Sequence, residues 1–257
     1  MAHLNDRELL TNIAEAARIL AEEGREFNRN LLVEFERWKA VDPKWLRRLP
    51  AIPNEHLLFY KAVAQTLGWL QQTPVEKEPA RKGSKDTPSP LLIFYLQIMI
   101  EARHGKANNV GRRLEELIEQ MPDGIQVKKP RRLFGVIAGL ETWASVVLPD
   151  VGDEDILDLE EVQRLATKAG GRARWTALAP IKMYSISKGL DRATPIAICP
   201  PMGRAVSRGI ERLLGFKLGE SENDYEVSRG LHLKLADLAR ASIWDINSGF
   251  YRVGGGS

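Results

Sequence analysis

The chain has 257 residues, of which 44% are hydrophobic and 28% are charged, and its formal net charge is +3. These values are typical of a soluble globular protein and exclude a disordered chain. A single cysteine, Cys199, excludes a disulfide framework, and with only four scattered histidines the sequence disfavours zinc and iron–sulfur sites. No apolar stretch approaches the roughly 18 residues of a membrane span. We therefore expect a cytoplasmic protein with no membrane partner.

The N-terminal part predicts helices. Apolar residues at helical spacing favour a helix that begins at Asn5 or Asp6, and Gly24 is expected to interrupt it before a second apolar stripe over 27–38. Asn54 is the predicted cap of a helix that runs to Gln71. We assign residues 1–72 to an N-terminal helical lobe.

The stretch 73–89 predicts a flexible linker or loop. It holds three prolines, a dense mixture of charges and almost no apolar residues. Such a segment buries too little apolar surface to offset the entropy of ordering it. The remaining boundaries follow from this break: a helical domain over 90–253 and a flexible tail over 254–257.

The domain over 90–253 reads as further helices. The expected ranges are 91–100, 109–120, 130–147, 158–168, 175–190, 203–214 and one long helix over 227–251. Asp158 and Glu161 are expected to form a capping pair at the start of the helix over 158–168. No β alternation is present. The predicted fold class is all-α, with two helical lobes and a helix–hairpin–helix-like element in the C-terminal half.

Several cofactor classes are disfavoured. The sequence has no GxxxxGK[ST] loop, no GxGxxG fingerprint, no GxSxG elbow and no HExxH. We therefore expect no nucleotide cofactor and no other resident cofactor.

Two further residues have structural predictions. Cys199 lies in an apolar context that favours a buried thiol, and His232 is predicted to be a partly buried surface histidine.

The segment over 158–215 indicates nucleic-acid binding. Between 158 and 215 the order is helix, glycine turn, helix, loop and short basic helix. A helix–hairpin–helix of this kind directs backbone N–H groups toward a DNA phosphate, and basic side chains reinforce the contact. The alternative is a plain helical hairpin with a glycine cap. The candidate nucleic-acid-binding residues are Gly170, Gly171, Arg172, Arg174, Arg204 and Arg208.

The run over 185–210 resembles a stretch of bacterial helix–hairpin–helix DNA glycosylases, especially relatives of the 8-oxoguanine glycosylase type. The matching pieces, in order, are Ser187-Lys188, Pro195-Ile196 and Arg204-Ala205-Val206, and the closing SIWDINSGFYRVG is similar to a C-terminal helix of that family. The resemblance implies a duplex DNA partner and the removal of a base. A modified rather than damaged base would indicate defence against phage with modified DNA.

The resemblance departs at the catalytic aspartate. Family members place it directly after the Pro-Ile pair, where this chain has Ala197-Ile198-Cys199. Three alternatives stay open for the catalytic carboxylate. Asp191 stands at the family's sequence distance from the glycine turn and could have taken the role. Otherwise Asp245 approaches from the final helix, or the site is not catalytic. Lys188 is an amine nucleophile that would form a Schiff base, a phosphate contact, or a residue on the helix surface.

The implied reaction needs a carboxylate beside an oxocarbenium-like sugar and a pocket for the flipped base. Aromatic residues available to line that pocket are Trp175, Tyr184 and Trp244. Two other classes stay open: a non-catalytic helical nucleic-acid-binding or assembly protein, and a helical interaction subunit without a DNA role. The sequence does not fix the oligomeric state.

Overall fold

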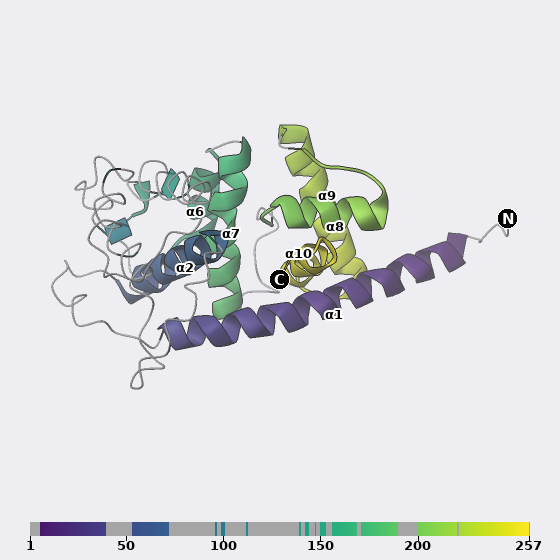
Figure 1. Ribbon diagram of the computed structural model, residues 1–257, viewed down its shortest axis with the longest axis horizontal. Coiled ribbons are helices and arrows are strands. Elements are labelled where there is room, and N and C mark those ends of the chain that lie inside the picture. Colours follow the sequence, from purple (N-terminus) through teal and green to yellow (C-terminus); the bar gives the residue numbers. More distant parts are fainter. Residues whose placement is uncertain are drawn as a thin grey trace. The chain divides into compact units, whose positions relative to one another are not determined.

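The computed structural model describes residues 6–39, 53–71, 156–168, 171–189, 200–219 and 221–256, with short pieces between 96 and 152. These residues contain seven helices and no strand, which confirms the predicted all-α fold (Figure 1). The helices are α1 (Asp6–Lys39), α2 (Asn54–Gln71), α6 (Leu159–Thr167), α7 (Gly171–Ser187), α8 (Arg204–Leu214), α9 (Glu222–Ala239) and α10 (Ile243–Val253). In the part of the chain just named, none of the helices is both long enough and apolar enough to cross a membrane.

The chain divides into two compact units that do not follow chain order. The first unit joins residues 1–33 to residues 185–257, and the second unit comprises residues 34–184. The first unit is therefore built from both ends of the chain. The predicted linker over 73–89 lies outside the described residues, so that boundary stays a prediction.

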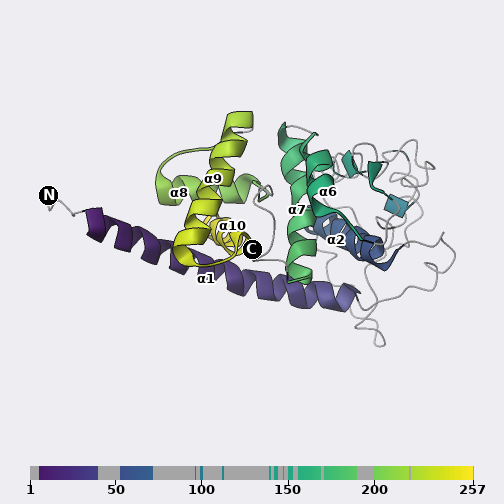
Figure 2. The same ribbon diagram turned by 180° about the vertical axis from the view of Figure 1, so that it is seen from behind.

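Helix α10 is the centre of the first unit. It lies against α1 on one side and beneath α8 and α9 on the other, and the two opposite views agree on this arrangement (Figures 1 and 2). Every residue from Ser242 to Phe250 is buried. Trp244, Ile246 and Phe250 are fully buried and supply most of its apolar surface. A helix buried on nearly all sides is expected only at the middle of a core.

Glycines allow α1 and α10 to touch backbone to backbone. A Cβ added to Gly24 would overlap the carbonyl oxygen of Asp245, and a Cβ added to Gly249 would overlap that of Leu20. The prediction that Gly24 interrupts the first helix is wrong, because α1 runs unbroken from Asp6 to Lys39. Gly24 is at a helix crossing, where the missing side chain allows the close approach.

A second glycine pair joins α8 to α10. A Cβ on Gly209 would overlap the carbonyl oxygen of Phe250, and a Cβ on Gly254 would overlap that of Ala205. Gly254 is buried, and its N–H donates to the Phe250 carbonyl at 2.9 Å. This residue, predicted to begin a flexible tail, thus belongs to the packed unit.

The predicted single helix over 227–251 is wrong, because the structure has two helices there. Arg240 adopts a left-handed backbone (φ 50°) that ends α9, and the Ser242 hydroxyl accepts the N–H of Trp244 at 3.0 Å to begin α10. A serine cap so close to a left-handed residue is a turn signal. The apolar spacing continues across this turn over 227–251, so the sequence predicted one helix.

The helices before and after Gly170 follow the predicted order. Asp158 caps α6 by accepting the N–H groups of Glu160 and Glu161 at 2.9 and 3.2 Å. The Glu161 carboxylate pairs with Arg164 instead of completing a capping pair. Helix α7 begins at Gly171, four residues before the expected start, and continues through Pro180.

Aromatic rings fill the core of the second unit. Phe59 on α2 meets Trp143 and Tyr184 edge to face, with ring centroids 5.4 and 5.5 Å apart. All three side chains are nearly or fully buried. Such offset contacts between aromatic rings add to the gain from burying their area.

We predict that the substitutions Gly24→Ala and Gly209→Ala each lower the free energy of unfolding of the protein by about 1–3 kcal/mol or more, because each adds a methyl group into a backbone contact. Urea unfolding followed by tryptophan fluorescence measures the loss.

The matched control is Gly230→Ala on α9, where an added Cβ meets nothing within 4 Å. Removing a helical glycine there is expected to stabilise the protein by about 0.5–1 kcal/mol. Equal stability of Gly209→Ala and the wild type would contradict the proposed tight crossing.

Candidate nucleic-acid interface

Helix α8 presents a basic face at its N-terminal end. Arg204 and Arg208 lie one turn apart and are exposed, whereas Val206, Gly209 and Ile210 are buried. The spacing of these residues is therefore that of an amphipathic helix docked on a core. Both guanidinium groups project from the exposed side of the same two turns.

The first turn of α8 has no side-chain cap. Gly203 is the N-cap residue and is itself exposed, and it offers no hydroxyl or carboxylate to the first N–H groups. The N-terminal end of a helix carries partial positive charge and free N–H donors. Together with Arg204 and Arg208, this end of α8 is suited to an anionic group such as a phosphate.

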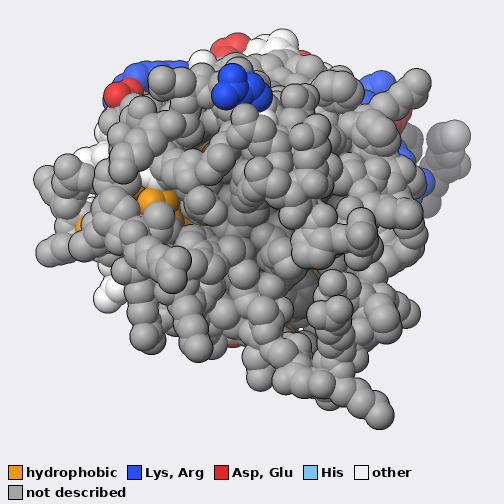
Figure 3. Space-filling model, turned by 60° about the vertical axis from the view of Figure 1, so that its left-hand side comes forward, with side chains coloured by type: hydrophobic (Ala, Val, Ile, Leu, Met, Phe, Trp, Pro, Cys, Tyr) orange, Lys and Arg blue, Asp and Glu red, His pale blue; other side chains and the backbone are white. Residues whose placement is uncertain are grey.

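The opposite end of α8 has a different character. Leu213, Leu214 and Phe216 are 50%, 42% and 41% exposed. On the face drawn in Figure 3, the side chains of the described residues include both basic and acidic groups. The chain as a whole has a formal net charge of only +3, so the exposed pair Arg204 and Arg208 is a local basic feature.

Lys188 lies in the turn after α7 and is exposed. Its backbone N–H donates to the Ser185 carbonyl at 3.3 Å, so the turn continues the end of the helix. An exposed ammonium group suits a phosphate contact better than it suits a desolvated amine nucleophile. The phosphate contact of Lys188 stays a prediction.

The glycine-turn candidates are only partly described. Gly170 lies outside the described residues, and Gly171 is the first residue of α7. Arg172 and Arg174 are in the first turns of α7, within the second unit, whereas Arg204 and Arg208 belong to the first unit. The hairpin itself stays a prediction.

Asp245 is buried and held by two partners on α1. Its carboxylate accepts the Asn28 side-chain amide at 2.9 Å and pairs with Arg25 at 3.4 Å. Asn28 in turn accepts the Ser248 hydroxyl at 2.6 Å. Sequence reasoning missed both α1 partners, which lie more than 200 residues away along the chain. The network commits both Asp245 oxygens to joining α10 to α1.

The three pocket candidates belong to two different units. Trp244 is fully buried in the first unit, and Tyr184 is nearly fully buried in the second. Trp175 lies on α7, also in the second unit. The Tyr184 hydroxyl donates to Glu55 at 2.6 Å, and burial together with this bond raises the pKa of Tyr184. Both described side chains are thus core residues within their own units.

Asp191, the remaining catalytic candidate, lies outside the described residues, as do Cys199 and the Pro195-Ile196 pair. No cluster of three or more metal-ligating side chains occurs within the described part of the chain.

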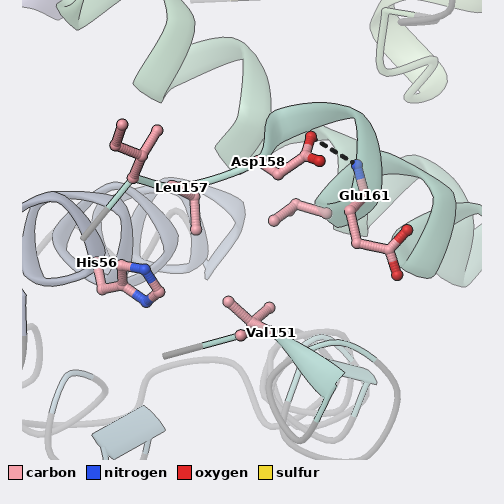
Figure 4. Close-up of a pocket in the computed structure, with 8 residues that line it drawn as sticks. His56, Val151, Leu157, Asp158 and Glu161 are labelled. Atoms are coloured by element: carbon pink, nitrogen blue, oxygen red, sulfur yellow. Dashed lines mark hydrogen bonds between the residues drawn. The ribbon is translucent and has the colours of Figure 1, made fainter. Parts of the chain in front are cut away.

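A small hollow of about 50 Å³ lies in the second unit, among His56, Val151, Leu157 and the start of α6 (Figure 4). The acidic groups at its edge already have partners. Asp158 accepts backbone N–H groups at the start of α6, and Arg164 holds the pKa of Glu161 below its ordinary value. The space is sufficient for one or two water molecules but too small for a base.

Comparison of the sequence with protein-family models and with curated proteins found no match, and comparison of the structure with solved structures found none. The resemblance to helix–hairpin–helix DNA glycosylases therefore rests on the motifs over 185–210 and on the closing helix.

We predict that the substitution Asp245→Ala lowers the free energy of unfolding by about 1–3 kcal/mol, because it leaves the buried Asn28 amide without its acceptor. The control is Glu226→Ala, which removes the partner of Arg229 on the exposed side of α9 and is expected to change stability by less than about 1 kcal/mol. Chemical unfolding measures both. A loss for Asp245→Ala no greater than that for the control would show that the network adds no stability.

Proposed function

We propose that the protein binds duplex DNA and removes a damaged or modified base from it by cleaving the N-glycosidic bond. The observation that carries the proposal is the exposed, basic and uncapped first turn of α8, within the stretch that resembles helix–hairpin–helix glycosylases. The chain has 37 Lys and Arg residues against 34 Asp and Glu residues, so attraction to DNA depends on such local surfaces.

In the proposed complex, Arg204 and Arg208 contact the phosphates of one strand. The first N–H groups of α8 add neutral donors to the same anionic group. The exposed Lys188 is a further phosphate contact. Contacts of this kind fix the position of a protein on the duplex without reading sequence.

In the proposed reaction, a carboxylate stabilises the positive charge that develops on the sugar as the bond between C1′ and the base breaks. A water molecule adds to C1′ and gives up a proton, and the departing base takes a proton, which leaves an abasic site. The base must first leave the stack, which costs a few kcal/mol.

Asp191 is the proposed catalytic carboxylate. The bonds of Asp245 to Asn28 and Arg25 favour this choice, because a carboxylate bonded to a neighbouring helix cannot also approach a sugar. The second candidate function, nucleic-acid binding without chemistry, is favoured by the same burial of Asp245, since it removes one of the two available acids.

We predict that the double variant Arg204→Ala/Arg208→Ala binds duplex DNA more weakly at every sequence tested. The slope of log K against log salt should fall in magnitude by about 2, one for each lost phosphate contact. Fluorescence anisotropy at several salt concentrations measures both quantities.

The matched control for binding is Arg18→Ala/Arg229→Ala, which removes the same charge from two arginines that pair with glutamates on α1 and α9. It should leave the slope unchanged. If both double variants weaken binding equally, α8 has no special role, and if the wild type does not bind duplex DNA the proposed function is wrong.

We predict that Asp191→Asn lowers the rate of abasic-site formation at least about 100-fold while it preserves DNA affinity, because the amide keeps the shape but not the charge. The assay uses duplexes that each carry one oxidised, alkylated or bulky modified base, with strand scission by alkali as the readout.

The comparison variant for excision is Asp245→Asn. It should retain excision wherever it stays folded, since its proposed role is structural. Full activity of Asp191→Asn together with loss in a folded Asp245→Asn would reverse the assignment. Absence of abasic sites on every substrate, with binding intact, would favour the non-catalytic alternative.

A further inference from the structure

The segment Pro200–Gly203 leads directly into the first turn of α8. Pro201 and Met202 are buried, whereas Gly203 and Arg204 are exposed. No side chain caps this end of the helix, so its first turn is held by Gly254 against Ala205, by the buried Val206 and by contacts to the preceding segment. The structure provides such a contact from α10.

Asn247 on α10 holds the segment. Its side-chain amide donates to the Pro201 carbonyl at 2.9 Å, two residues before the N-cap of α8. Asn247 is 1% exposed, so the bond is shielded from competing water. A second amide hydrogen remains for another acceptor.

His232 on α9 supplies that second acceptor. Its Nδ1 lies 2.7 Å from the Ser228 carbonyl, which can only accept, so the hydrogen bonds assign the proton to Nδ1. Nε2 is then an acceptor and lies 3.3 Å from the Asn247 amide nitrogen. The ring is fully buried and packs edge-on against Phe250, which corrects the prediction of a partly buried surface histidine.

We infer that Asn247, oriented by His232, is a positioning residue that fixes the first turn of α8 for its contact with a DNA phosphate. The inference rests on the proposed function of that turn. The polar chain runs from the Ser228 carbonyl through His232 and Asn247 to the Pro201 carbonyl. It joins α9, α10 and the segment that precedes α8.

The position of Asn247 on α10 explains why this residue and not a neighbour has the role. Asp245 and Ser248, three residues apart, face α1 through Asn28. Asn247 lies on another side of α10 and reaches the Pro201 carbonyl. The Gly209 crossing with Phe250 sets the separation of α8 and α10 further along. The Gly209 crossing, the Gly254 contact with Ala205 and the Asn247 bond together hold α8.

The test compares Asn247→Ala with Ser248→Ala. Both residues are fully or almost fully buried on α10. Asn247→Ala removes an amide with two buried hydrogen bonds, and Ser248→Ala removes a hydroxyl that donates one. Both are expected to lower the melting temperature. Only Asn247→Ala is expected to accelerate amide hydrogen exchange selectively over 204–208 and to weaken duplex DNA binding, by roughly 5- to 10-fold, with a salt slope smaller by about 1.

A third variant, His232→Phe, keeps a ring of similar shape but removes the Nε2 acceptor. It should show the same selective change in exchange and binding as Asn247→Ala, and the double variant should show little more than either single one, because the two residues act as one unit.

The outcomes separate the two proposals. Failure of the wild type to bind duplex DNA would refute the proposed function itself. Wild-type binding that Asn247→Ala and Ser248→Ala weaken equally, with no selective exchange over 204–208, would refute only the positioning role of Asn247.

Discussion

The first unit depends on direct backbone contact between α10 and the two helices that it crosses. Each crossing uses two glycines: Gly24 and Gly249 between α1 and α10, and Gly209 with the C-cap residue Gly254 between α8 and α10. Side chains elsewhere along these helices can then interlock at short range. Because packed interiors tolerate little added volume, this arrangement fixes the depth to which α10 sits between its neighbours.

Close contact alone does not fix the rotation or the register of α10. Hydrogen bonds from its polar residues fix both. Asp245 and Ser248 bond to Asn28 on one side, and Asn247 bonds to Pro201 and His232 on another. Buried polar groups are costly unless they are satisfied, so a helix shifted by one residue would lose several partners at once. The network thus specifies one register, and apolar residues such as Trp244 and Phe250 supply most of the burial.

The sequence was sufficient for features that are encoded locally. The all-α class follows from apolar spacing, α8 agrees with its expected range, and Asp158 caps α6 as predicted. The errors arose where a distant partner decides the outcome. Gly24 was predicted to break the helix because the residues around it in the sequence give no sign of its contact with the Asp245 carbonyl. His232 was predicted to be partly exposed because its partner Asn247 lies on another helix. A unit made from both chain ends is likewise invisible to a reading in chain order.

The same distinction bears on the two acids of the proposed site. The sequence favours Asp191 by its distance from the glycine pair but leaves Asp245 open as an acid on the final helix. Asp245 holds two residues of α1, and freeing it for chemistry would require breaking the contact on which α10 depends. A catalytic carboxylate must instead meet solvent and substrate, and Asp191 precedes the segment that Asn247 anchors. In the proposed excision, α10 contributes indirectly, because it holds the first turn of α8 in place through Asn247 and the glycine contacts.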